Sequence, residues 1–239
     1  MMHAVARLRE QRQAVSNKPF RARGCLVERC PSCRVALKYC ICKWQKQVLT
    51  HCGICLLMHD KEPLKPSNTG WLIADVVPDT FAFLWSRTQV DEKLLALLAD
   101  PQWQPYVVFP EEYAEPEQVV HSVTRNHETS KKPLFIILDA TWLQARKIFR
   151  KSPYLANFPV LSFQPEHLSH YQLRRSNRDD HLCTVEVGAL CLELAHEFEA
   201  QNVLENWFAR FTKHYLAAKK PPSKDQQEAY FRELPVTEL

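Results

Sequence analysis

From residue 52 onward, short apolar segments alternate with segments of helical periodicity, and this alternation restricts the fold more than any other feature of the sequence. Strands are predicted where a segment is short, apolar or β-branched and ends at proline or polar residues, at 52–58, 80–85, 106–109, 134–138 and 160–163. Helical periodicity predicts helices at 70–77, 91–99, 116–125, 142–151, 183–199 and 203–218. Such alternation favours an α/β fold, with a mostly parallel sheet flanked by helices.

The length of 239 residues and a hydrophobic content of 46% suit one large domain with an appendage. The sequence has no apolar run of membrane-spanning length, and its first ten residues lack the apolar core of a signal peptide. We therefore expect a soluble, cytoplasmic protein without a membrane partner. In that compartment cysteines stay reduced, so clustered cysteines indicate a metal site.

Four cysteines lie close together near the N-terminus, in the pattern Cys30-x2-Cys33-x6-Cys40-x-Cys42. Structural zinc takes four ligands of this kind in a tetrahedron, which leaves no open position for catalysis. A rival pair, Cys52 and Cys55, also has a two-knuckle spacing relative to Cys33. Cys52 begins an apolar strand, so the two side chains of this pair would point to opposite faces. This geometry favours the first four cysteines as the zinc ligands.

Positive charge is concentrated at the N-terminal end of the chain. Residues 1–50 contain eleven Lys and Arg against two Glu, although the whole chain has a net charge of only +4. A basic end on a mildly acidic body is expected where one module follows a phosphate backbone. The alternative is a solvated basic arm. A second basic patch lies at Arg174, Arg175 and Arg178, where it either meets nucleic acid or forms a solvated loop.

Asp139, Thr141 and Trp142 directly follow the apolar strand 134–138. Ligands bind in open α/β sheets at the carboxyl ends of the strands, so Asp139 is a candidate base and Trp142 a candidate stacking surface. The alternative for Asp139 or Thr141 is that an oxygen side chain caps the following helix. Packing against the sheet is the alternative for Trp142.

Glycine is scarce, with only Gly24, Gly53, Gly70 and Gly188, and this excludes the glycine-rich turns of common nucleotide sites. A polar turn, Ser67-Asn68-Thr69-Gly70, instead enters a predicted helix and is suited to capping it or to holding a ligand. Further polar or proline-stiffened strand ends are expected at the same edge of the sheet as Asp139, and they belong to His59, Asp60, Phe109 and Pro110.

The chain resembles the DTW-domain family, named for an Asp-x-Thr-Trp motif that stands here at Asp139–Trp142. The resemblance also covers the four cysteines, the turn Ser67–Gly70 and the segment from Tyr171-x-Leu173-Arg174 to Thr184-x-Glu186. It implies a fold similar to that of SPOUT RNA methyltransferases, and the function of a bacterial tRNA-uridine aminocarboxypropyltransferase. Such an enzyme moves the 3-amino-3-carboxypropyl group of S-adenosylmethionine onto N3 of a uridine in the tRNA variable loop.

This resemblance implies a role for each candidate residue. Catalysis is expected from Asp139 as the base, with Thr141 and Trp142. S-adenosylmethionine is expected to contact His59, Ser67, Asn68, Thr69, Gly70, Phe109, Pro110, Leu138 and Thr184. Zinc is expected on Cys30, Cys33, Cys40 and Cys42. RNA is expected to contact Arg21, Arg23, Lys43, Arg146, Arg150, Arg174 and Arg175. No protein partner is implied.

The expected organisation is a basic N-terminal arm (1–24), a zinc-binding knuckle (25–50), the DTW α/β catalytic domain (51–218) and a C-terminal tail (219–239). Two other functions remain open at this point. One is an S-adenosylmethionine-dependent RNA methyltransferase, which would release S-adenosylhomocysteine and not methylthioadenosine. The other is a non-catalytic RNA-binding protein that uses the knuckle and the basic arm and has no affinity for S-adenosylmethionine.

Overall fold

The computed structural model describes residues 2–17, 27–123, 131–163 and 182–218. Within these residues six parallel strands form one sheet in the order β2-β1-β5-β3-β6-β4. The strands are β1 (Gly53–Met58), β2 (Thr80–Leu84), β3 (Trp103–Val108), β4 (Val119–Val120), β5 (Lys132–Asp139) and β6 (Val160–Leu161). The expected parallel α/β fold is therefore confirmed.

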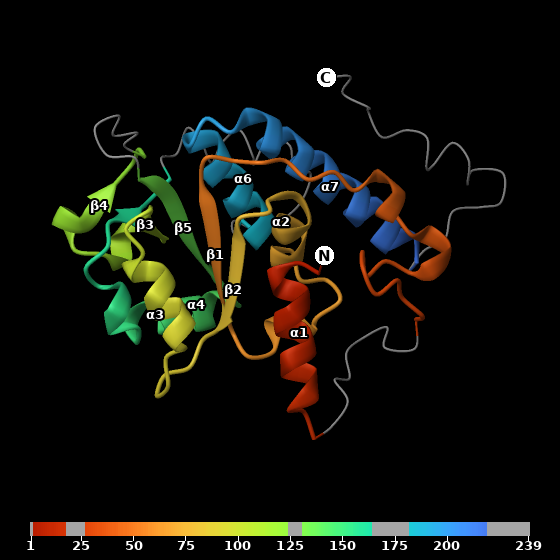
Figure 1. Ribbon diagram of the computed structural model, residues 1–239, viewed down its shortest axis with the longest axis horizontal. Coiled ribbons are helices and arrows are strands. Elements are labelled where there is room, and N and C mark those ends of the chain that lie inside the picture. The colour runs from red at the N-terminus through yellow and green to blue at the C-terminus, as the bar shows by residue number, and fades with distance from the viewer. Residues whose placement is uncertain (1, 18–26, 124–130, 164–181, 219–239) are drawn as a thin grey trace.

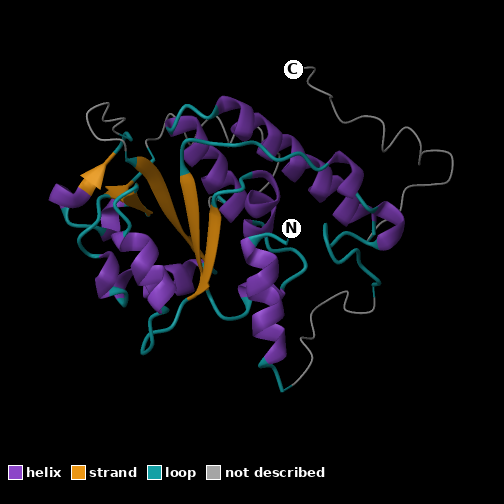
Figure 2. Cartoon of the chain, viewed as in Figure 1, coloured by secondary structure: helices purple, strands orange, loops and turns teal. Residues whose placement is uncertain are grey.

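The helices are α1 (Ala4–Ala14), α2 (Gly70–Val76), α3 (Glu92–Ala99), α4 (Trp142–Arg150), α6 (Thr184–Leu194) and α7 (Phe198–Ala217). Single 3-10 turns lie at η1 (Leu37–Tyr39), η2 (Cys42–Trp44), η3 (Glu62–Leu64), η4 (Glu111–Tyr113), η5 (Pro116–Gln118) and η6 (Pro153–Leu155). As Figures 1 and 2 show, the helices lie on both sides of the strands.

Two hydrophobic cores lie on the two faces of the sheet. On one face α2, α6 and α7 pack with side chains of β1 and β5 such as Leu56 and Phe135. On the other face α3 and α4 cover the alternate side chains of the same strands, including Leu57 and Ile136. Strand residues are buried on both sides, which is why these segments read as nearly continuous apolar runs.

The carboxyl ends of β1 and β5 form a crevice because the chain leaves these neighbouring strands toward opposite faces. The chain leaves β1 for α2, which belongs to the first core, whereas it leaves β5 for α4, which belongs to the second. Met58 pairs with Asp139 at the last position of the register between the two strands. In α/β sheets such a switch point is where ligands bind.

The helix expected at 116–125 is wrong. Pro116 begins only the single turn η5, after which Val119 and Val120 form the edge strand β4 beside β6. Two adjacent β-branched residues suit a pleated strand better than a helix. The break between α6 and α7 also comes earlier than expected. It lies at residues 195–197, where His196 has a φ of 58°.

The segment expected as a basic arm contains α1. His3 accepts a hydrogen bond from the amide of Ala6 and thereby caps this helix. Val5 and Leu8 are buried in the first core, and α1 lies alongside β2 in Figure 1. Among the described residues, no helix is both long and apolar enough to cross a membrane.

Candidate functional site

Asp139 ends the central strand β5, and its carboxylate is held by two side chains from distant parts of the sequence. The side chain is only 3% exposed. Asn68 donates from Nδ2 to Oδ2 over 2.7 Å, and Thr184 donates from Oγ1 to Oδ1 over the same distance. Burial raises the pKa of Asp139 to about 6, although both hydrogen bonds oppose this shift. The carboxyl group is therefore held in place by two hydrogen bonds, and its pKa lies closer to neutral than that of an ordinary aspartate.

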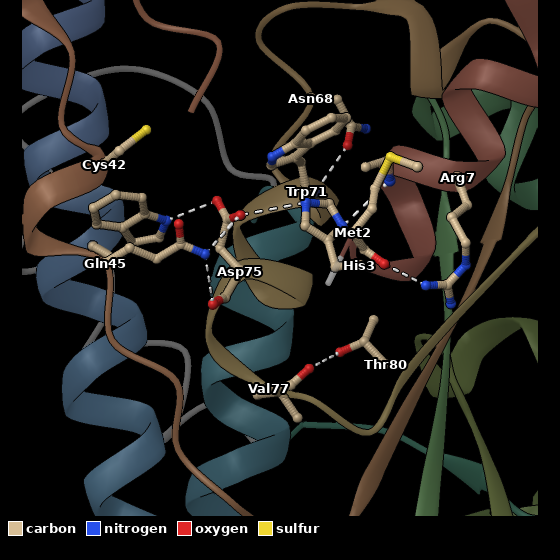
Figure 3. Close-up of polar contacts among 12 residues, drawn as sticks. Met2, His3, Arg7, Cys42, Gln45, Asn68, Trp71, Asp75, Val77 and Thr80 are labelled. Carbon is tan, nitrogen blue, oxygen red and sulfur yellow. Dashed lines mark hydrogen bonds and ion pairs between the residues drawn. The ribbon is translucent and has the colours of Figure 1, made fainter. Parts of the chain in front are cut away.

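The turn before α2 is built around this carboxylate. Asn68 uses its Oδ1 to accept a hydrogen bond from the amide of Trp71, so its Nδ2 is oriented toward Asp139. Figure 3 shows the Asn68–Trp71 contact. At Gly70 an added Cβ would lie 2.6 Å from Oδ2 of Asp139, so only glycine leaves room for the carboxylate. The predicted turn is therefore part of the site, and Asn68 caps the first turn of α2.

A cavity of about 730 Å³ opens in front of Asp139. This volume is within the range of pockets that bind small organic cofactors. It is lined by ten of the predicted catalytic and cofactor residues: Ser67, Asn68, Thr69, Phe109, Pro110, Leu138, Asp139, Thr141, Trp142 and Thr184. Two others lie behind it: Gly70 is packed against Asp139, and His59 donates its amide to the Asp139 carbonyl over 3.0 Å.

An aromatic wall forms one side of this cavity. Phe109 stacks on Trp142 with ring centroids 5.6 Å apart, and on Phe149 at 4.5 Å. Tyr113 meets the edge of Trp142 at 5.7 Å. Trp142 therefore packs within an aromatic cluster and also borders the cavity. The two interpretations of this residue, packing and ligand contact, are compatible.

Thr141 is the N-cap residue of α4. Its hydroxyl donates to Oε1 of Gln144 over 2.7 Å, and its amide donates to the same oxygen. The side chain of Thr141 therefore caps α4, which is the alternative role that the sequence offered for it. The hydroxyl group that donates to Asp139 belongs to Thr184.

Sequence reasoning missed an ion pair in the same cavity. Glu62 is buried, and its Oε1 lies 2.5 Å from Nζ of Lys65. Both residues line the cavity, and their charges act on Asp139 in opposite directions. Glu62 begins the one-turn helix η3 and Lys65 follows it, and a single turn has no periodicity that could have marked these residues in advance. The wall of the cavity therefore offers one negative and one positive group side by side.

The four predicted zinc ligands come together in the knuckle. Their sulfur atoms all lie within 4.8 Å of one another, with Cys30 and Cys42 at 3.5 Å and Cys33 and Cys40 at 3.8 Å. Four thiolates at tetrahedral zinc are separated by roughly 3.8 Å, so the arrangement fits this metal. Cys52 and Cys55 are buried in opposite cores, as expected from their positions in the strand.

Local backbone contacts shape the knuckle, and α7 supports it. The carbonyl of Cys30 accepts a hydrogen bond from the amide of Arg34, and the amide of Cys30 donates to the carbonyl of Val35. Arg34 has a φ of 62°, which closes this turn. On the other side, Nδ1 of His214 in α7 lies 2.9 Å from the carbonyl of Tyr39. The knuckle is thus packed against α7.

The predicted RNA-binding residues fall into three groups. Lys43 is exposed in the knuckle, with its ammonium over the ring of Trp44. On α4, Arg150 is exposed, whereas Arg146 is half-buried and packs over Tyr113. The remaining residues lie outside the described part of the chain: Arg21, Arg23, Arg174 and Arg175.

Comparison with known proteins gives a family but no structural neighbour. The model of the DTW domain matches residues 27–216, which include the four cysteines, the Asn68 turn, Asp139 and Thr184. No solved structure matches the chain. The match covers most of the chain and every part of the site described above, and it fits a tRNA-modifying enzyme. The chain belongs to the DTW-domain family.

Proposed function

We propose that this protein transfers the 3-amino-3-carboxypropyl group of S-adenosylmethionine to N3 of a uridine in the variable loop of tRNA. The observation that carries the proposal is Asp139, a buried carboxylate whose pKa is raised to about 6 beside a cavity of cofactor size. A general base works best when its pKa lies near the working pH. Membership of the DTW-domain family supports RNA as the class of substrate.

The reaction needs a base because N3 of uridine is a weak acid and a poor nucleophile until it loses its proton. In the proposed step Asp139 takes the N3 proton, and the freed electron pair attacks the terminal carbon of the aminocarboxypropyl chain. The bond between that carbon and the sulfonium sulfur breaks, and its electron pair stays on sulfur. The products are the modified uridine, neutral methylthioadenosine and a protonated Asp139, which returns its proton to solvent.

The two ends of S-adenosylmethionine match two parts of the cavity. Its adenine is a flat aromatic group, and the wall of Phe109 and Trp142 offers a surface of the same kind. Its amino acid end carries an ammonium and a carboxylate, and the pair Glu62 and Lys65 offers the opposite charges. We assign the amino acid end to this pair, which directs the transferred chain toward Asp139.

The zinc ion belongs to the scaffold in this proposal. Four thiolates complete its coordination, so it supplies stability and has no open position for a substrate. The site that acts on uridine is separate, because Asp139 is reached from the sheet edge and the four cysteines lie in the knuckle.

The test is incubation with S-adenosylmethionine and unmodified tRNA, followed by mass spectrometry of the nucleosides and of the released cofactor. We expect aminocarboxypropyl-uridine together with methylthioadenosine. Methylated RNA with S-adenosylhomocysteine would support the methyltransferase instead, and a protein without affinity for S-adenosylmethionine would support a simple RNA binder.

The Asp139→Asn variant should bind cofactor and tRNA but form no product, because the amide cannot accept the N3 proton. Asp91→Asn is the matched control. Asp91 caps α3 through its side chain, and asparagine caps helices equally well, so this variant should keep full activity. Full activity of Asp139→Asn would exclude Asp139 as the base.

A further inference from the structure

A second cavity, of about 640 Å³, lies between α1, the knuckle and the start of α2. The turn between Lys65 and Trp71 separates it from the cavity at Asp139. Lys65 and Asn68 line the Asp139 cavity, whereas Pro66 and Trp71 line the second one. Both cavities are therefore large enough for a nucleotide and share one wall.

Positive groups dominate the lining of this second cavity. Arg9 comes from α1, and Arg29 and Arg34 come from the knuckle, against the single carboxylate of Glu10. The arginines of α1 and of the knuckle are separated in the sequence, and the fold brings them to the same cavity. Part of this charge compensates a zinc-loaded knuckle, because four thiolates on Zn²⁺ leave a net charge of −2. Arg9 belongs to a different wall of the cavity.

Two of these guanidinium groups share one aromatic side chain. The Arg34 guanidinium lies 4.3 Å from the ring centroid of Trp71, and the Arg9 guanidinium lies 5.9 Å from the same centroid. Arg34 is only 2% exposed. Two like charges are thus held close together at this wall.

Arg34 also has unused hydrogen-bond donors. Its Nη1 reaches the Lys65 carbonyl over 3.4 Å, but among the described residues its Nε and Nη2 have no acceptor. The indole Nε1 of Trp71 and the Nε of Arg29 also lack one in this part of the chain. A buried donor without an acceptor costs about 1–3 kcal/mol. The surroundings of this cavity are therefore short of acceptors and rich in donors.

Asp75 does not meet this demand, because other donors occupy its carboxylate. Its Oδ1 is 3.3 Å from Nε2 of His3 and 3.3 Å from Nε2 of Gln45, and its Oδ2 accepts from Nε1 of Trp207 over 3.0 Å. Figure 3 shows His3 and Gln45 turned toward Asp75, with Trp71 beside them. A ligand with hydrogen-bond acceptors and a negative charge would pair with these donors and with the arginines of the cavity.

We propose that this second cavity binds a phosphodiester of the RNA backbone, close to the nucleotide whose base enters the Asp139 cavity. The proposal rests on the RNA substrate proposed above. A phosphodiester carries a negative charge and acceptor oxygens, and arginine is the side chain best shaped to bind it. The shared wall at Lys65–Trp71 places this contact next to the site of the reaction.

The test is the affinity of the full-length protein for unmodified tRNA as a function of salt, measured by fluorescence anisotropy. Arg9→Gln is the informative variant, because Arg9 is half-buried and contacts Trp71 through its charge. Arg7→Gln is its control: it removes the same charge from the same helix, but Arg7 is exposed, donates to the carbonyl of Met2 and lies outside the cavity lining.

We expect Arg9→Gln to weaken tRNA binding about tenfold and to reduce the slope of log affinity against log salt by about 0.7–0.9, the value for one phosphate contact. Arg7→Gln should keep the slope of the unaltered protein, and so should Arg9→Lys, which retains the charge. The affinity of Arg9→Gln for S-adenosylmethionine should be unchanged, because Arg9 lines the second cavity and not the Asp139 cavity.

Equal slopes for Arg9→Gln and the unaltered protein would overturn the phosphate site while leaving the proposed function intact. Equal losses for Arg7→Gln and Arg9→Gln would do the same, because they would show only diffuse attraction. An unaltered protein that does not bind tRNA would overturn both proposals. If Arg9→Gln fails to fold, the salt dependence of Arg9→Lys decides. A reduced slope in this variant would contradict the charge assignment, because lysine retains the positive charge.

Discussion

The protonation of Asp139 links its surroundings to the reaction. The carboxylate sits in the fold with its pKa raised to about 6, so the base is mostly ionised at neutral pH but loses this form in mild acid. Asn68 and Thr184 donate to the ionised form and keep its pKa from rising further. The side chain that performs the proposed chemistry is thus tuned by two groups that take no proton themselves.

If Asp139 is the base, kcat/KM should rise with pH through a midpoint near 6. Thr184→Val removes one hydrogen bond from the ionised carboxylate, so the midpoint should move up by about one pH unit. Thr80→Val is the control, because it removes a hydroxyl elsewhere in the fold, which donates to the Val77 carbonyl away from Asp139 (Figure 3). Its midpoint should equal that of the unaltered protein.

The same titration affects stability, and the sign can be worked out. The pKa of Asp139 is higher in the fold than its ordinary value of 3.8, so the fold favours the protonated form. The stabilisation is complete below pH 3.8 and is lost as pH rises through about 6. Asparagine does not titrate, so the free energy of unfolding of Asp139→Asn relative to the unaltered protein should increase as pH rises from 3.8 to about 6. Denaturant unfolding at pH 4 and pH 8 measures this gain, and equal differences at both would contradict the burial of an ionised group.

Glu62 and Lys65 are expected to read the amino acid end of S-adenosylmethionine. Glu62→Gln and Lys65→Gln should each weaken S-adenosylmethionine binding about tenfold, because each removes one charge-assisted hydrogen bond. Methylthioadenosine lacks the amino acid end, so its affinity should stay unchanged. Calorimetry with both ligands measures the two effects. A parallel loss of both affinities would mean that the substitution damaged the cavity and that the pair has no selective role.

At the scale of elements, the knuckle and α7 depend on each other. Tyr39 meets His214 by a hydrogen bond, and Lys46 pairs with Glu199 near the start of α7. Trp44 lies beside His214 and under the guanidinium of Arg210. Loss of zinc should therefore loosen a helix that is far from the cysteines in sequence.

Cys40→Ser should lower the zinc content, measured by elemental analysis, because three thiolates hold zinc less well than four. Amide hydrogen exchange along α7 should become faster in the same variant. Cys52→Ser, which alters a buried cysteine outside the sulfur cluster, should keep the zinc content. Unchanged zinc in Cys40→Ser together with its loss in Cys52→Ser would move the metal to the rival pair.

Sequence patterns correctly predicted those strands and turns whose conformation is determined by a few neighbouring residues. The strand before Asp139 and the turn before α2 were predicted because an apolar run and a capping sequence signal themselves over short distances. The segment 116–125 misled for the same reason, because Pro116 followed by Glu117 and Gln118 resembles a helix start. The outcome is decided by the pairing of β4 with β6, a strand that lies 41 residues further along the chain.

At the scale of the whole molecule, the site depends on contacts that no local pattern contains. Asn68 and Thr184 were both predicted near the cofactor, but their convergence on Asp139 follows from the strand order. Arg9, Arg34 and Trp71 meet because α1 and the knuckle both lie against α2. Long-range contacts of this kind follow from topology and packing, and not from periodicity or residue type.

The packing of the knuckle on α7 has a consequence for the order of events during synthesis. Tyr39 and His214 are 175 positions apart, so the ribosome completes the knuckle roughly 10–35 seconds before its supporting helix. Over that interval the cysteines are held by their own short turns and, if zinc binds as proposed, by the metal that would join them. Metal uptake and docking of α7 would then be separate steps, and we expect a newborn chain deprived of zinc to present α7 with no ordered surface to meet.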